Sequence, residues 1–173
     1  MKVIKAKRYS DIPEVAALRT GSEFRGALMA RIFEVGCEMI GEEEITKLMK
    51  EAIHRNAVLR AETAKSQISE EGYVKDFFDA PAIGWSIGST GMKCSDSDIL
   101  ELTEDMGYMQ YHYCPILHKW QTMGYDQETC EKLCDIAMQG DRTMAAVMGY
   151  DFELKETLAA GDDYCDIRYI RKK

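Results

Sequence analysis

The chain has 173 residues, of which 46% are hydrophobic and 30% are charged, and its formal net charge is −8 at pH 7. This length suits one domain with a buried core, and the composition is that of an ordinary globular protein. No apolar run approaches the roughly 20 residues of a membrane helix, and the basic N-terminus lacks the apolar segment of a signal peptide. The acidic balance disfavours nucleic acid as a partner because phosphate would be repelled. We therefore expect a cytoplasmic protein without membrane or nucleic acid contacts.

The first 65 residues predict helices. An acidic residue followed by proline predicts a short helix over about 12–20, which the Gly21-Ser22 pair is expected to end. Apolar residues at helical spacing predict two longer helices, over 23–40 and about 43–65. Because a single glycine joins these two helices, we expect them to form a helical hairpin.

From about residue 80 the pattern changes to one that is typical of strands. Partial alternation predicts strands over 82–88, 97–102 and 107–113. Proline and aspartate start signals then predict two helices, over 115–123 and from about 126 to 139. These two helices would form an insertion between strands.

The C-terminal segments 151–159 and 164–170 alternate again and flank the Gly161-Asp162 pair, which predicts a β-hairpin.

The order of elements predicts one α+β domain that spans residues 1–173. Its N-terminal helical hairpin would pack on an antiparallel β-sheet that carries a two-helix insertion. The helical part is expected over about 11–65 and the sheet part over about 80–171.

Cys114 has the position that most favours reactivity. It lies at the predicted junction of a strand and a helix, just before Pro115. The positive end of a helix stabilises a thiolate, so we expect the pKa of this thiol to be lowered. His118, one helical turn later, would lie on the same face and could act as its base. The alternative is a buried cysteine that fills space where the strand ends.

Further cysteines leave a metal site open as an alternative. Cys130 and Cys134 lie one turn apart on a predicted helix, where they could equally form its apolar side. A zinc ion could be held by Cys114, His118, Cys134 and Cys165, although the spacing is not that of a zinc knuckle. We expect no other cofactor.

Three segments together resemble the L-2-amino-thiazoline-4-carboxylic acid hydrolase family. They are Tyr-His-Tyr-Cys-Pro-Ile-Leu-His-Lys-Trp-Gln-Thr-Met-Gly at 111–124, Cys-Glu-Lys-Leu-Cys-Asp at 130–135, and Leu-Lys-Glu-Thr-Leu-Ala-Ala-Gly-Asp-Asp-Tyr-Cys-Asp-Ile-Arg at 154–168. The resemblance covers about residues 30–170. It implies a small-molecule hydrolase that opens a cyclic, amidine-like C–S or C–N bond. In the family's named reaction, water adds to the ring carbon, the C–S bond breaks and N-carbamoyl-L-cysteine forms.

The resemblance also implies which residues would carry the reaction. Cys114 would act as nucleophile or metal ligand, and His118 or His112 would move protons. Cys165 belongs to the last motif and would join the catalytic group if its face of the strand lines a cavity.

Other residues would bind the substrate. Asp135 or Asp166 would hold the amidine-like group through charge-assisted hydrogen bonds. Arg168 would bind a substrate carboxylate, and Tyr111 and Trp120 would line the pocket.

A competing hypothesis is a non-catalytic domain of the same fold that binds or senses a small ligand, with or without a metal. Clustering of the cysteines and His118 around a cavity would favour the enzyme, whereas scattering through a dry core would favour the binding domain. The sequence leaves the oligomeric state open, since the amphipathic N-terminal helices could pair with a second copy or cover the sheet.

Overall fold

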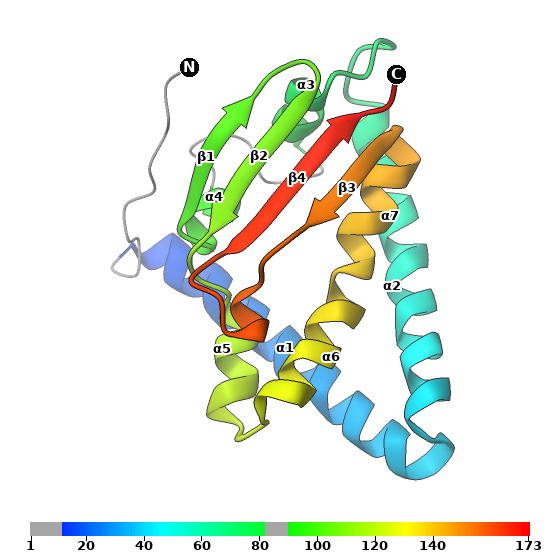
Figure 1. Cartoon of the computed structure of the whole chain (residues 1–173), viewed down its shortest axis with the longest axis vertical. Helices are drawn as coiled ribbons and strands as arrows, with labels where there is room; N and C mark the ends of the chain where they lie inside the picture. The colour runs from blue at the N-terminus through cyan, green and yellow to red at the C-terminus, as the bar shows by residue number, and fades with distance from the viewer. Residues whose placement is uncertain (1–11, 82–89) are drawn as a thin grey trace.

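The computed structural model describes residues 12–81 and 90–173, which form a four-stranded antiparallel sheet with helices on one face (Figure 1). The order of strands in the sheet is β1-β2-β4-β3. This arrangement confirms the predicted α+β class. The helices that precede the sheet are α1 (Pro13–Ile40), α2 (Glu42–Lys65), α3 (Val74–Asp79) and α4 (Thr90–Cys94). The first two strands are β1 (Ser97–Leu102) and β2 (Met106–Tyr111), and the last two are β3 (Tyr150–Leu154) and β4 (Cys165–Arg171).

Three helices connect β2 to β3, where two were predicted. They are α5 (Pro115–Thr122), α6 (Gln127–Ala137) and α7 (Gln139–Met148). The third helix was missed because it follows α6 after a single residue and contains Gly140 in its first turn. Gly149, in the left-handed conformation, ends it.

The N-terminal helix is continuous, so the predicted break at Gly21-Ser22 was wrong. A glycine costs a helix only about 1 kcal/mol, and packing on both sides of this one holds the helix together. Arg19, before the glycine, donates to the carbonyl oxygen of Cys94 and pairs with Asp96. Gly26, after it, packs directly on α5.

The predicted strand over 82–88 lies outside the described residues. The predicted C-terminal hairpin is present, because β3 and β4 pair with antiparallel register, but its connection is longer than expected. The chain leaves the sheet after Leu154, so the strand predicted to continue to 159 was wrong. A 3-10 helix, Leu158–Ala160, occupies the connection, and the Thr157 hydroxyl caps it.

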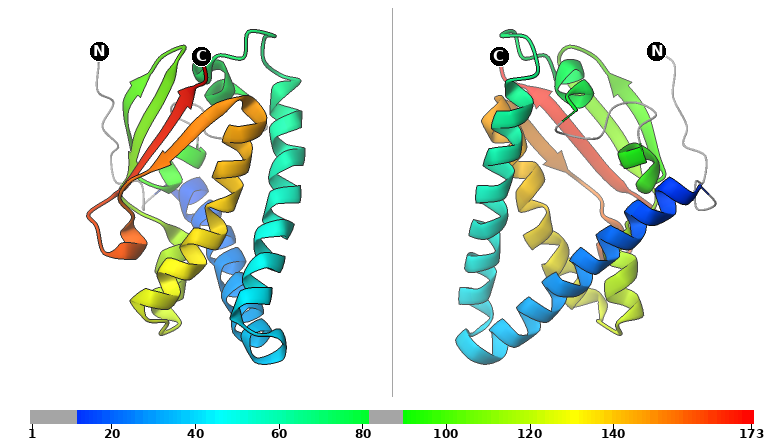
Figure 2. Two further views of the ribbon diagram at one scale, coloured as in Figure 1. Left: turned by 45° about the vertical axis from the view of Figure 1, so that its right-hand side comes forward. Right: turned by 180° about the vertical axis from the view of Figure 1, so that it is seen from behind.

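The core has two parts. One lies between the inner face of the sheet and helices α2, α3 and α7, and it includes Phe77, Met109 and Tyr169. The other lies where α1, α5 and α6 meet, around Trp120 and Leu133. From behind, α1 crosses below the sheet and α2 runs up beside α7 (Figure 2). None of the helices in the described ranges is long and apolar enough to cross a membrane.

The turn between α1 and α2 depends on a close contact at Gly36. A Cβ atom at this position would overlap the side chain of Ile45, which is buried on α2. By contrast, a Cβ atom at Gly21, on the same helix, would meet nothing within 4 Å.

These two glycines form a matched pair for a stability test. We expect Gly36→Ala to lower the free energy of unfolding by about 1–3 kcal/mol, because the added methyl must displace Ile45. Gly21→Ala is expected to raise it by about 0.5–1 kcal/mol, because alanine loses less entropy in a helix. Urea unfolding curves of both variants measure this. Equal stability of the two variants would contradict the described packing.

Candidate functional site

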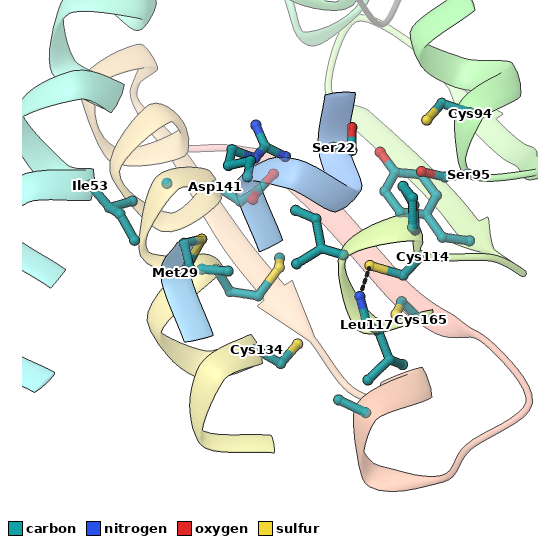
Figure 3. A pocket seen from close by; sticks show the side chains of 18 of the residues that line it. Ser22, Met29, Ile53, Cys94, Ser95, Cys114, Leu117, Cys134, Asp141 and Cys165 are labelled. Carbon is teal, nitrogen blue, oxygen red and sulfur yellow. Dashed lines mark hydrogen bonds between the residues drawn. The ribbon is translucent and has the colours of Figure 1, made fainter. Parts of the chain in front are cut away.

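A cavity of about 460 Å³ lies between the two parts of the core, lined by α1, α2, α4, α5, α6, α7, the 3-10 helix and the inner face of β2 and β4 (Figure 3). Ligand sites for drug-sized molecules typically have volumes of about 300–1,000 Å³. Most of the lining is apolar, with side chains such as Met29, Ile53, Leu117, Met144 and Ile167. The cavity is therefore large enough for an organic ligand and offers it mainly apolar contacts.

Four cysteine thiols line this cavity, and one of them is Cys94 at the end of α4. Cys114 is the N-cap residue of α5, Cys134 lies on α6 and Cys165 begins β4. The Cys114 Sγ accepts a hydrogen bond from the Leu117 amide at 3.5 Å, and the Cys165 Sγ accepts one from the Leu158 amide at 3.4 Å. All six cysteines of the chain are free thiols.

Burial keeps these thiols protonated. It raises the pKa of Cys134 to about 12 and that of Cys165 to about 11, and in both cases the neighbouring thiols add to the effect. Burial also raises the pKa of Cys114, and this outweighs the amide hydrogen bonds of α5 that lower it. The expectation that the helix N-terminus lowers this pKa was therefore wrong, because the loss of water destabilises the thiolate more than the amide hydrogen bonds stabilise it.

The alternative of a metal site finds no geometric support in the described part of the chain. There, no group of three or more histidine, cysteine, aspartate or glutamate side chains is arranged to hold a metal ion. His118, one of the four predicted ligands, does not line the cavity.

Asp141 contributes a carboxyl group to the cavity lining and is not among the residues predicted from the sequence. It lies on α7, the helix that was not predicted, and its Oδ1 accepts a hydrogen bond of 2.9 Å from the Tyr169 hydroxyl. Burial raises the pKa of Asp141, while the Tyr169 hydroxyl and the guanidinium groups of Arg60 and Arg25 lower it by less. A carboxyl with a raised pKa in a cavity is typical of functional sites.

Two arginines and Asp141 give one region of the cavity a polar character. Arg25 comes from α1 and Arg60 from α2, and both line the cavity. Ser22 and Asn56 lie in the same lining, one helical turn before each arginine. No motif in the sequence marks these residues, since they are single polar positions on long helices.

Several of the predicted site residues do meet at the cavity. Cys114 and Cys165 line it, as does Cys134. Tyr111 and Trp120 also belong to the lining, as predicted for the substrate pocket. Their roles in binding or catalysis stay predictions.

The two predicted proton-transfer histidines lie elsewhere. His118 is exposed on α5, with its ring 5.9 Å from that of Tyr113. The Nε2 atom of His112 lies 3.1 Å from the Asp98 carboxylate. Neither imidazole lines the cavity, so neither is placed to act on a molecule bound there.

Asp166 and Arg168 lie on the opposite face of the sheet from the cavity. Successive strand residues point to opposite faces, so Cys165 faces inward and Asp166 faces outward. The Asp166 carboxylate accepts hydrogen bonds from the Arg168 Nε at 3.0 Å and the Tyr108 hydroxyl at 2.8 Å. The guanidinium of Arg168 also stacks over the Tyr108 ring, 4.2 Å from its centroid.

Asp135 faces solvent on α6. Its carboxylate pairs with Lys50 on α2 at 2.6 Å and with Arg142 on α7 at 2.7 Å. Burial raises its pKa, but the two partners together lower it by more. It does not line the cavity, and its ion pairs tie three helices together.

Comparison with solved structures finds a similar fold in a protein of low sequence identity. The crystal structure of a trafficking protein particle complex subunit 3 from Naegleria fowleri, covalently bound to palmitic acid, has a TM-score of 0.54 at 14% sequence identity, and the match covers 90% of this chain and 97% of that one. The phenol-responsive sensory domain of the transcription activator PoxR, with phenol, has a TM-score of 0.49 at 14% identity, with 87% and 74% covered. No curated protein matches the sequence.

A family model gives a more specific result. The model described as L-2-amino-thiazoline-4-carboxylic acid hydrolase matches residues 22–169, which include all three segments that carry the resemblance. The chain belongs to the L-2-amino-thiazoline-4-carboxylic acid hydrolase family.

Proposed function

We propose that the cavity is the active site of a hydrolase that opens a small cyclic amidine, such as an amino-thiazoline carboxylic acid, and that Asp141 moves the protons of the reaction. The observation that carries the proposal is the carboxyl of Asp141, whose pKa is raised by burial inside a cavity lined by arginines and thiols. A general acid or base works best when its pKa lies near the working pH. Membership of the family supports ring opening as the type of reaction.

The polar region of the cavity suits a substrate that carries an amidine and a carboxylate. Arg25 and Arg60 supply guanidinium groups for the carboxylate, which they can bind with paired hydrogen bonds. This contact would place the amidine end of the substrate against Asp141. The apolar remainder of the cavity excludes water from the ring and strengthens these electrostatic contacts.

Ring opening then needs one water molecule and one group that carries a proton. As the water oxygen bonds to the protonated amidine carbon, the Asp141 carboxylate accepts one proton from this water. Asp141 returns the proton to the ring sulfur while the C–S bond breaks and the sulfur leaves with the bonding electrons. The remaining hydroxyl proton passes to solvent as the carbonyl group of the carbamoyl product forms.

Cys114 offers an alternative nucleophile in the same site. Its thiol is neutral, because burial raises its pKa, so it would need Asp141 to remove its proton before attack. The variant Cys114→Ser distinguishes the two routes. Attack by water predicts that most activity is retained, whereas attack by Cys114 predicts its loss.

A second candidate function is the binding of a small apolar ligand without catalysis. The volume of about 460 Å³ and the apolar lining favour it, since they exceed what one thiazoline ring requires. The structure of similar fold that holds palmitic acid covalently is consistent with such a use of this architecture. Turnover separates the two functions: an enzyme converts the thiazoline to product, whereas a binding domain binds its ligand and leaves it unchanged.

Replacing the Asp141 carboxyl tests the central role in this proposal. We expect Asp141→Asn to lower kcat for thiazoline ring opening by about 10²–10⁴-fold, because an amide cannot carry the proton. The assay measures release of the free thiol of the product. Asp151→Asn is the matched control, since Asp151 is exposed on β3, pairs with Lys172 and does not line the cavity. Full activity of Asp141→Asn would refute the role of Asp141.

The same carboxyl makes stability depend on pH. The raised pKa means that folding favours the protonated form of Asp141. The stabilisation is complete below the pKa of an unfolded aspartate, about 4, and is lost as pH rises through the folded-state pKa. Urea midpoints should therefore show Asp141→Asn gaining stability relative to the wild type between pH 4 and pH 7. A constant difference over that range would mean that the pKa is ordinary.

The raised pKa values also predict that the cavity thiols react slowly. At pH 7 we expect Cys134 and Cys165 to react with a disulfide reagent far more slowly than in the unfolded chain, because almost no thiolate is present. Their rates should keep rising up to pH 9 without a plateau. Peptide mapping by mass spectrometry assigns each rate to its cysteine. A plateau near neutral pH at either cysteine would show an activated thiolate instead.

A further inference from the structure

The outward face of α1 carries large apolar side chains that the fold leaves in solvent. Phe24 is 73% exposed, Leu28 is 63% exposed and Met39 is 76% exposed. Ile32 and Val35, between them, are 43% and 48% exposed. Single exposed apolar residues are ordinary, but a continuous row along one helix marks an interaction site.

These five residues share one face of the helix, which we call the α1 stripe. Their spacing of three, four or seven residues is the spacing of neighbours on an α-helix. The opposite face is buried, with Gly26 and Ala30 against the rest of the fold. Helix α1 therefore has two apolar faces, although a helix on the surface of a monomer needs only one.

We infer that the α1 stripe is a self-association surface, on which α1 pairs antiparallel with α1 of a second copy of this chain. The stripe is symmetric about its midpoint, between residues 31 and 32. An antiparallel two-fold pairing about that point sets Phe24 against Met39 of the second copy and Leu28 against Val35. It sets Ile32 at the axis, close to its own equivalent. A two-fold interface uses the same patch twice, and the patch must therefore be complementary to itself in this way.

The size of the stripe agrees with a stable dimer. A large apolar side chain exposes about 150–200 Å² in full, so the five exposed fractions amount to on the order of 500 Å² per chain. A standard interface buries about 800 Å² per partner, of which somewhat more than half is apolar. The stripe alone supplies that apolar share.

The charge at the midpoint of the stripe does not oppose this pairing. Arg31 lies at the midpoint and would meet its equivalent across the axis, where two cations would repel each other. However, its guanidinium already pairs with Glu34 on the same helix, and Glu34 also accepts a hydrogen bond from Tyr125. Each guanidinium is thus compensated by its own carboxylate before the helices meet.

Dimerisation on this face would also support the cavity. Ser22, Arg25 and Met29 line the cavity from the neighbouring face of the same helix. A second helix against the stripe would hold this wall in place without entering the cavity.

Light scattering after gel filtration, at micromolar concentration, tests the inference. The wild type should have the mass of a dimer, and Leu28→Glu should weaken dimerisation at least about a hundredfold and give a monomer with an unchanged circular dichroism spectrum. Leu59→Glu is the matched control, because Leu59 is 65% exposed on α2, outside the stripe, and this variant should remain dimeric. A monomeric wild type overturns the inference, as does a dimer that survives Leu28→Glu.

A pair of double variants tests the antiparallel register. L28E/V35K sets opposite charges against each other twice across the predicted axis, so it should recover the dimer that L28E loses. L28E/V35E sets like charges against each other at the same two contacts and should stay monomeric. If both double variants behave alike, the pairing of position 28 with position 35 is wrong.

Discussion

The indole N–H of Trp120 donates a hydrogen bond of 2.8 Å to the carbonyl oxygen of Gly26, and this contact fixes α1 against α5. It is possible because Gly26 has no side chain: a Cβ atom there would lie only 3.0 Å from the Ile116 side chain and 3.2 Å from the Ile116 backbone. Trp120 is buried, so the hydrogen bond is shielded from water. With α1 fixed in this way, Arg25 and Met29 become part of the wall of a cavity that the sheet and α5–α7 otherwise leave open on one side.

Desolvation determines the chemistry that this cavity can support. The same loss of water that raises the pKa of the four thiols also raises that of Asp141. A raised pKa lowers the reactivity of a thiol, since less of the reactive thiolate is present at neutral pH. For a carboxyl it is enabling, since a group that is otherwise fully ionised becomes able to exchange a proton. In the proposed reaction, Asp141 moves the protons and the thiols form a neutral, polarizable wall.

The sequence predicted what depends on local patterns and missed what depends on packing. The α+β class follows from periodicity and strand alternation, which a single sequence contains. Asp141 was missed because α7 begins one residue after α6, around a glycine that favours a turn. The pKa of Cys114 was predicted in the wrong direction, because the helix end is visible in the sequence and the depth of burial is not. Likewise, nothing in the sequence shows that His118 faces solvent while Cys114, four residues earlier, faces the cavity.

The most direct measurement of the central claim is the pKa of Asp141 itself. Carbon-13 NMR of the aspartate side-chain carboxyls, with Asp141→Asn used to assign the signal, follows its titration in the free protein and with 2-amino-thiazoline-4-carboxylic acid bound. The account predicts a pKa clearly above the ordinary value of about 4, and a shift of that pKa when the cationic amidine binds next to it. A carboxyl that titrates near 4 and does not respond to the ligand would contradict it.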